Sequence, residues 1–285
     1  MKDSSSPNIP LVLSIAGSDS SGGAGIQADL KVITALGGYG MTAVTAITAQ
    51  NTLGVTQIQA IDLDVIEAQI DVVIADMGVD VVKIGMLATP EIVRVVAKTL
   101  RRHQVKQIIL DPVLQATSGA SLGGNETAAA MREDLFPITN LITPNLSEAS
   151  ILLGRVITQA HEFPLAAQEL MQLGPQAVLI KGGHLPNAVS DLTDYLLWQS
   201  ESGIQFREFH HRRIDTINTH GSGCTLAAAI ATYLASGLTL DEAVAKAIDY
   251  VEAGIVAGQD LNLGDGAGPL WHMHAFYPQS NAKQD

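Results

Sequence analysis

The stretch LVLSIAGSDSSGGAGIQADLKVITALGGYGMTAVTAITA, residues 11–49, contains a complete strand–helix–strand pattern. The apolar run 11–17 predicts a strand, the amphipathic segment 24–38 predicts a helix that ends at glycines, and the run 41–49 predicts a second strand. Two strands joined through a helix lie parallel in one sheet and are connected by a right-handed crossover. This unit therefore predicts an α/β protein.

The same alternation continues to residue 256. Further helices are expected at 64–76, 90–102, 125–135, 146–153, 164–173, 223–236 and 240–256. Further strands are expected at 79–86, 107–113, 141–144, 177–183, 194–198 and just before Asp215. The pattern predicts a doubly wound, mostly parallel sheet with helices on both faces, in a single domain. Ligands of such sheets bind at the carboxyl ends of the strands.

Composition narrows the class of protein. The chain has 285 residues, of which 47% are hydrophobic and only 4% aromatic, which suits a parallel sheet covered by helices. The net charge of −13 argues against binding to nucleic acid or to an anionic membrane. The only cysteine, Cys224, excludes an intrachain disulfide, and the start of the chain has no apolar segment, so a cytoplasmic protein is expected. We expect a disordered leader at 1–8, one domain at 9–277 and a polar tail at 278–285.

The segment HGSGCTLAAAIATYLASG, residues 220–237, places two glycines before an apolar helix. Main-chain N–H groups of Gly221, Ser222 and Gly223 could converge on an anion there, as a transferring phosphoryl group requires. The same field is expected to lower the pKa of the Cys224 thiol, which could then accept a proton from an attacking hydroxyl. The alternative is an ordinary turn followed by a small buried cysteine.

A second glycine-rich loop, GSDSSGGAG at 17–25, lies between the first expected strand and helix. It predicts close approach of a ligand to the main chain. The loop matches neither the phosphate loop with its lysine nor the dinucleotide-binding order of glycines. The alternative is a flexible turn in which Asp19 and Ser20 cap the helix.

Several other residues at expected strand ends suit a heteroaromatic ligand. The primary amide of Gln50 can pair with both a donor and an acceptor on a ring, whereas Asn51 has an equally good role in a turn. Met86 offers a polarizable surface, or belongs to the core. Asp29, in the first helix, has the pattern of a solvated helix residue.

Charged residues at other strand ends suit phosphate and metal. Asp111 and Glu148 are possible Mg²⁺ ligands, directly or through water. Glu148 also follows Asn145 at the spacing of a capping box, and both roles are compatible. Lys181 ends a buried strand, where an ammonium needs a partner such as a nucleotide phosphate. The eight histidines show no zinc-ligand spacing apart from 272–274, so a zinc site is not expected.

Together these segments resemble the hydroxymethylpyrimidine/phosphomethylpyrimidine kinases, in family order from about residue 11 to 277. The matching motifs are GSDSSGGAGIQADLK, ITAQNT, KIGML, DPV, TPNLSEA, KGGH, NTHGSGCT and GAGPLWHMH. The resemblance implies a ribokinase-like fold and usually a homodimer. It also implies ATP- and Mg²⁺-dependent phosphorylation of 4-amino-5-hydroxymethyl-2-methylpyrimidine, and then of its monophosphate to the diphosphate, in thiamine biosynthesis.

The resemblance also implies roles for individual residues. Gln50 would recognise the pyrimidine, with Gly17, Asp29 and Met86 lining its pocket. The anion hole would consist of Gly221, Ser222, Gly223 and Cys224, with Cys224 also the base. Mg²⁺ and the ATP phosphates would be handled by Asp111, Asn145, Glu148 and Lys181.

The chain departs from the family pattern at three places. GSGC replaces the common GTGC and keeps a hydroxyl. Thr117 stands where many relatives have a lysine in the loop after DPV, and Thr48 stands where an aliphatic residue is common. These changes put loop closure and the pocket wall beside Gln50 in question.

Three other functions stay open. A pyridoxal or pyridoxine kinase of the same superfamily acts on a similar hydroxymethylated ring, and some members share the cysteine. A nucleotide-binding oxidoreductase is disfavoured by the missing glycine fingerprint. A non-catalytic protein that binds the pyrimidine or a nucleotide is the third.

Overall fold

The computed structural model describes residues 9–114, 123–183 and 191–277. The strands are β1 (Leu11–Asp19), β2 (Tyr39–Asn51), β3 (Gly54–Ala60), β4 (Val81–Ile84), β5 (Ile108–Leu110), β6 (Leu141–Ile142), β7 (Ala177–Ile180), β8 (Asp191–Ser200) and β9 (Gly203–Arg212). The α-helices are α1 (Gly25–Ala35), α2 (Leu63–Met77), α3 (Pro90–Arg102), α4 (Gly124–Ala130), α5 (Leu146–Leu153), α6 (Phe163–Met171), α7 (Ser222–Ala235) and α8 (Leu240–Gly258). Short turns of other helix types occur at Met131–Leu135, Phe136–Ile138 and Ala160–Glu162.

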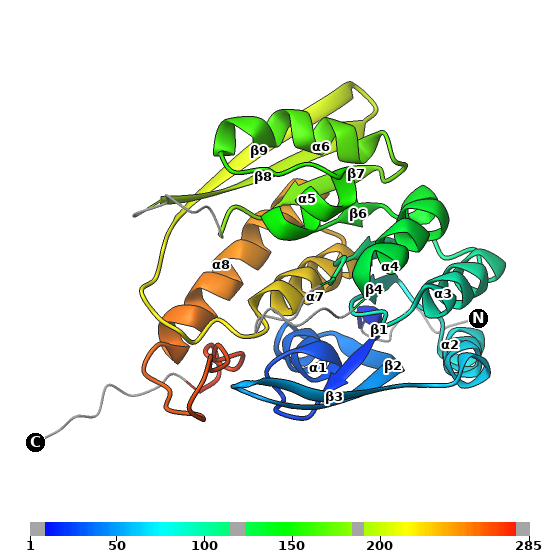
Figure 1. Ribbon diagram of the computed structural model, residues 1–285, viewed down its shortest axis with the longest axis horizontal. Helices are drawn as coiled ribbons and strands as arrows, with labels where there is room; N and C mark the ends of the chain where they lie inside the picture. Colours follow the sequence, from blue (N-terminus) through cyan, green and yellow to red (C-terminus); the bar gives the residue numbers. More distant parts are fainter. Residues whose placement is uncertain (1–8, 115–122, 184–190, 278–285) are drawn as a thin grey trace, which may run out of the picture.

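The strands form one sheet in the order β3-β2-β1-β4-β5-β6-β7-β8-β9 (Figure 1). Strands β2, β1, β4, β5, β6 and β7 are parallel, whereas β3 at one edge and β8 and β9 at the other pair antiparallel. This confirms the predicted α/β class and the mostly parallel sheet.

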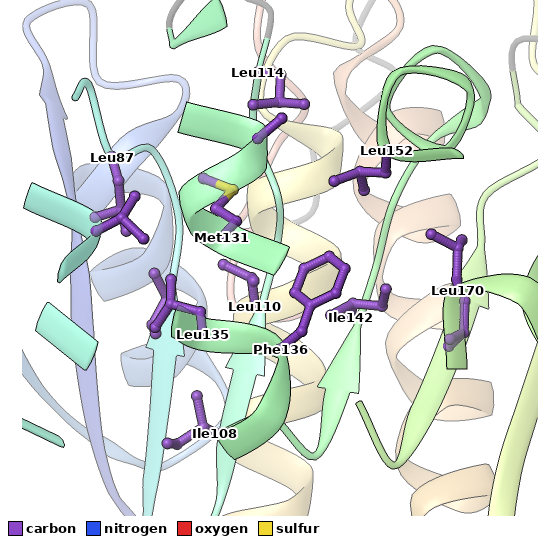
Figure 2. Close-up of a cluster of buried hydrophobic side chains, with 14 of the residues drawn as sticks. Leu87, Ile108, Leu110, Leu114, Met131, Leu135, Phe136, Ile142, Leu152 and Leu170 are labelled. Carbon is purple, nitrogen blue, oxygen red and sulfur yellow. The ribbon is translucent and has the colours of Figure 1, made fainter. Parts of the chain in front are cut away.

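Two apolar layers cover the sheet. Because successive side chains of a strand point to opposite faces, Leu13 and Ile15 pack in one layer while Val12 packs in the other. The first layer joins the sheet to α2, α3, α4, α5 and α6, and Figure 2 shows the part of it around Phe136. The second layer joins the sheet to α1, α7 and α8. The doubly wound arrangement therefore leaves the strand ends, not the faces, open to ligands.

The structure differs from the sequence prediction in two elements. Strand β3 was not expected, because most of its side chains are exposed and it lacks the apolar alternation of a half-buried strand. The expected helix 125–135 is α-helical only to Ala130 and continues as a π-helical turn. The leader 1–8, the tail 278–285 and Thr117 lie outside the described residues.

None of the helices in the described parts of the chain is both long and apolar enough to cross a bilayer.

Candidate active site

A cavity of about 590 Å³ opens at the carboxyl ends of the parallel strands, next to the N-terminus of α7. It is lined by eleven of the residues that the sequence singled out: Gly17, Gln50, Met86, Asp111, Asn145, Glu148, Lys181, Gly221, Ser222, Gly223 and Cys224. They lie in or just after different strands and at the starts of α5 and α7, because the sheet order brings those ends to one edge.

The N-terminus of α7 lies beside the cavity, and its first turn has a geometry that suits an anion. Gly221 precedes the helix with φ +82°, in the left-handed region that favours glycine. The N–H group of Ser222 donates to the Thr219 carbonyl at 3.2 Å. Those of Gly223 and Cys224 have no acceptor within the described residues, as expected in the first turn of a helix.

The pKa of the Cys224 thiol is shifted in the direction opposite to the one expected from the helix field. Burial raises the pKa of Cys224 to about 11, and the nearby Lys83 ammonium opposes this only in part. The prediction of a lowered pKa is therefore wrong. Desolvation, together with the negative charges of Asp29 and Asp111, outweighs the lowering of this pKa by Lys83 and by the Gly25 N–H group. The residue is still partly accessible and lines the cavity.

Asp111 and Lys181 form an ion pair beside this helix. The Lys181 Nζ donates to Asp111 Oδ1 at 2.9 Å, and the Thr143 hydroxyl donates to the same oxygen at 3.0 Å. Burial raises the pKa of Asp111, but the ammonium groups of Lys181 and Lys83 outweigh burial and hold it below its ordinary value. Among the described residues, the partner of Lys181 is thus Asp111.

Both members of this pair face Gly223. A Cβ atom placed on Gly223 would lie 3.2 Å from the Lys181 Nζ and 3.7 Å from Asp111 Oδ2. Within the described residues, Oδ2 has no hydrogen-bond donor, so it is available to a metal ion or to water. A phosphate held at α7 would therefore meet an ammonium and a carboxylate oxygen together.

Glu148 and Asn145 form the capping box that their spacing predicts. The Asn145 side chain accepts from the Glu148 N–H at 2.9 Å, and Glu148 Oε2 accepts from the Asn145 N–H at 2.8 Å. Burial raises the pKa of Glu148 to about 7, against the lowering effect of Lys181. Near neutral pH, the Glu148 carboxyl group is thus protonated in part of the molecules and ionised in the rest.

The loop 17–25 packs against the turn before α7. A Cβ atom on Gly221 would lie 1.8 Å from the Gly23 carbonyl oxygen, and a Cβ on Gly23 would lie 2.4 Å from the His220 ring. The absence of side chains at these two glycines therefore allows the loop and the turn before α7 to pack closely together. At Gly17 a Cβ would instead lie 3.3 Å from the Met86 sulfur.

Asp19 holds the two segments together. Its carboxylate accepts from the N–H groups of Ser21 and Ala24, both at 2.8 Å, and lies 2.9 Å from His220 Nε2. Burial raises the pKa of Asp19, but hydrogen bonds from His220, Ser21 and Ala24 lower it far below its ordinary value. Asp19 therefore orders the loop and is not the N-terminal cap of α1, which has no side-chain cap.

Gln50 lies in the cavity wall at the end of β2. Its side-chain amide contacts Thr48 Oγ1 at 3.1 Å and His220 Nε2 at 3.4 Å. Ser20 Oγ holds its main chain by donating to the carbonyl at 2.7 Å and accepting from the N–H at 2.9 Å. The neighbouring Asn51 faces the hairpin turn, where its oxygen accepts from the N–H of Leu53 at 2.9 Å.

Asp29 neither faces solvent, as its helix pattern predicted, nor lines the cavity, as the family resemblance implied. It is fully buried and pairs with the equally buried Lys83 at 2.9 Å, while the Ser14 hydroxyl donates to it at 2.5 Å. Burial lowers the pKa of Lys83, but the negative groups around it, led by Asp29, raise it above its ordinary value. The pair therefore lies in the interior of the protein and outside the lining of the cavity.

The sequence analysis missed the outer wall of the cavity. That wall contains Asp194, His211, Arg213, Ile248, Val251 and Ile255. It is built by the antiparallel edge of the sheet and by α8, which carry no motif and are placed there by tertiary packing. Asp194 accepts from the Gly182 N–H at 2.7 Å, and His211 lies 3.3 Å from Asp194.

Comparison with known proteins agrees with this geometry. The family model described as phosphomethylpyrimidine kinase matches residues 19–271. The hydroxymethylpyrimidine/phosphomethylpyrimidine kinase of Rhizobium meliloti (strain 1021) is 45% identical over 268 residues, which are 94% of this chain and 98% of the relative.

Two solved structures share the fold. The phosphomethylpyrimidine kinase from Clostridium difficile 630 has a TM-score of 0.76 and 39% identity, over 87% of this chain and 99% of that one. The pyridoxal kinase from Staphylococcus aureus in complex with pyridoxal has a TM-score of 0.84 and 32% identity, over 95% and 96%, and has also been solved with ADP. The fold is therefore ribokinase-like, and the chain belongs to the phosphomethylpyrimidine kinase family.

Proposed function

We propose that this kinase transfers the γ-phosphoryl group of ATP to the hydroxymethyl oxygen of 4-amino-5-hydroxymethyl-2-methylpyrimidine. It then phosphorylates the monophosphate to the diphosphate, for thiamine biosynthesis. The observation that carries this proposal is that one cavity is lined by the ring-binding amide of Gln50, the anion-binding start of α7 and the Cys224 thiol.

Each group has a role that its position supports. Gln50 binds the ring edge, and Met86 with Gly17 packs against the ring face. The free N–H groups of Gly223 and Cys224 hold the transferring phosphoryl group, whose charge lies on its peripheral oxygens. The Lys181 ammonium stabilises the same charge, and Cys224 accepts the proton of the attacking hydroxyl.

Asp111 fits a magnesium ion, because its Oδ2 faces the phosphate position and has no donor among the described residues. Glu148 is next to it and would act through water, since its Oε2 caps α5. No cluster of three or more potential metal ligands occurs in the described parts of the chain, so phosphate oxygens would complete the coordination. When bound, the ion would neutralise charge on the phosphates.

A pyridoxal kinase is the second candidate, favoured by the high structural similarity to the pyridoxal kinase of Staphylococcus aureus. Measuring ADP formation with each substrate at equal concentration separates the two. We expect a higher kcat/KM for the pyrimidine. A clear preference for pyridoxal would reject the proposed substrate.

Gln50→Ala tests the substrate site within the same assay. Loss of the amide removes two hydrogen bonds to the ring, so KM for the pyrimidine should rise by about 10- to 100-fold. An unchanged KM would remove Gln50 from the ring-binding site.

We further propose that the enzyme acts in the cytoplasm as a homodimer. The hairpin of β2 and β3 exposes Ile47, Leu53 and Ile58 at a sheet edge, a surface suited to a second copy of the chain. Sedimentation of the wild type and of Ile58→Lys tests this assembly. A monomeric wild type would refute the homodimer.

A further inference from the structure

The side-chain amide of Gln50 has two polar neighbours in the cavity wall. Thr48 Oγ1 lies 3.1 Å from the amide atom placed as Oε1, and His220 Nε2 lies 3.4 Å from the atom placed as Nε2. The oxygen and nitrogen of a primary amide have nearly the same shape, so the protons on its neighbours decide which end is which.

Thr48 requires the NH₂ group at its end. Its hydroxyl has one hydrogen, and the Ser18 carbonyl, which only accepts, lies 2.9 Å away. The hydroxyl therefore donates to Ser18 and presents its lone pairs to Gln50. An amide oxygen there would face another oxygen without a hydrogen between them.

His220 requires the carbonyl at the opposite end. Its Nε2 lies 2.9 Å from Asp19 Oδ2, and the hydrogen bonds to Asp19 keep that group an ionised acceptor. Nε2 therefore carries its proton toward Asp19, and beside this N–H group an amide oxygen is favoured over an NH₂ group, which would place two donors together. Both neighbours of Gln50 thus select the same orientation of its amide.

We propose that Thr48 is a positioning residue that determines substrate specificity, because its hydroxyl holds the Gln50 amide in this one orientation. A ring in which an acceptor nitrogen adjoins an exocyclic amino group then meets a donor and an acceptor in a fixed order. The aminopyrimidine has this edge, whereas pyridoxal has no amino group beside its ring nitrogen. The inference rests on the proposed function and adds to it a residue, Thr48, that lines the same cavity.

Thr48→Val tests the inference, because valine keeps the shape of the side chain and removes the hydroxyl. KM for the aminopyrimidine should rise about three- to tenfold, the effect of losing one hydrogen bond, whereas kcat should change less than KM. The inhibition constant of pyridoxal as a competitor should not change. Thr48→Ser, which restores the hydroxyl, should return KM to about the wild-type value.

A double-variant cycle shows whether Thr48 acts through Gln50. In a Gln50→Ala background, Thr48→Val should have no further effect on KM. Thr56→Val is the matched control, because Thr56 donates a similar bond to the Ala49 carbonyl at 2.9 Å but is exposed and lies outside the cavity. It should leave KM unchanged.

Two results would overturn the inference: an unchanged KM in Thr48→Val, or the same increase with and without Gln50. Either would leave the proposed function intact provided that the wild type phosphorylates the aminopyrimidine. A wild type that does not phosphorylate it would instead reject the proposed function.

Discussion

At the scale of single residues, Cys224 combines an accessible position with a poorly ionised thiol. Burial raises the pKa of this thiol to about 11. Between pH 6 and pH 9 the thiolate is therefore a small fraction that grows about tenfold with each pH unit. If the thiolate accepts the proton of the attacking hydroxyl, the reaction should follow that fraction.

We expect log kcat of the wild type to rise with pH over this range. Cys224→Ser should lower kcat by about 100-fold or more and abolish the rise, because a serine hydroxyl does not ionise there. Steady-state assays of both proteins, with substrate affinity measured separately by calorimetry, check the result. The same slope in both proteins would exclude Cys224 as the base.

The protonation of Glu148, which lines the cavity, affects the stability of the folded protein. Because burial raises its pKa to about 7, the folded protein binds a proton that the unfolded chain has already released above the ordinary value of 4.5. This contribution to stability is complete below about pH 4.5 and is lost as pH rises through about 7.

Glu148→Gln should therefore stabilise the protein at pH 8 by about 1 to 3 kcal/mol relative to the wild type, and by less at pH 5. Glutamine keeps an oxygen that can accept from the Asn145 N–H, so the capping bond is retained. Urea unfolding of both proteins at the two pH values measures the difference. An equal effect at pH 5 and pH 8 would contradict the role of ionisation.

At the scale of elements, the pair of Asp29 and Lys83 joins α1 to β4. Both side chains are fully buried, and the pair links a helix that covers one face of the sheet to a strand within it. A buried carboxylate that loses its partner is left with most of its desolvation cost.

Lys83→Met should lower the free energy of unfolding by about 3 to 5 kcal/mol at pH 8. Burial already raises the pKa of Asp29, so protonation should make the loss smaller at pH 5. The double variant Asp29→Leu/Lys83→Met should recover part of the loss, because no unpaired charge remains. Urea unfolding tests this, and a double variant less stable than Lys83→Met would refute the explanation.

Helix starts and strand ends were the features that sequence patterns located best. The Asn145 and Glu148 spacing identified the start of α5, and the glycine pair identified the start of α7, because both signals lie within one turn of the helix they begin. Strand β3 was missed because its side chains are mostly exposed on both faces, so its residues follow no apolar period.

At the scale of the whole molecule, the cavity is bordered by both halves of the sheet. Phosphates bound there would contact α7, Asp111 and Lys181 together, which connects distant segments of the chain. A ligand that binds only the folded state stabilises it according to its concentration relative to Kd.

ADP with Mg²⁺ at 100 times its Kd should therefore raise the free energy of unfolding by about 2.7 kcal/mol. Removing Mg²⁺ with EDTA should reduce this stabilisation in the wild type. In Asp111→Asn the same treatment should change little, because the metal ligand is already lost. Urea unfolding with each ligand condition measures both effects; an Asp111→Asn protein that still responds fully to EDTA would exclude Asp111 as a ligand.

The alternation of strands and helices, the edge of the sheet at which the cavity lies, and eleven of the residues that line it could be predicted from the sequence alone. These follow from local periodicity and from the rule that parallel strands end together. The partners of the buried charges depend on tertiary packing: Asp29 pairs with Lys83, and Asp19 with His220, which is 201 residues away. The cost of burying a charge requires a partner, but sheet order and packing choose which one.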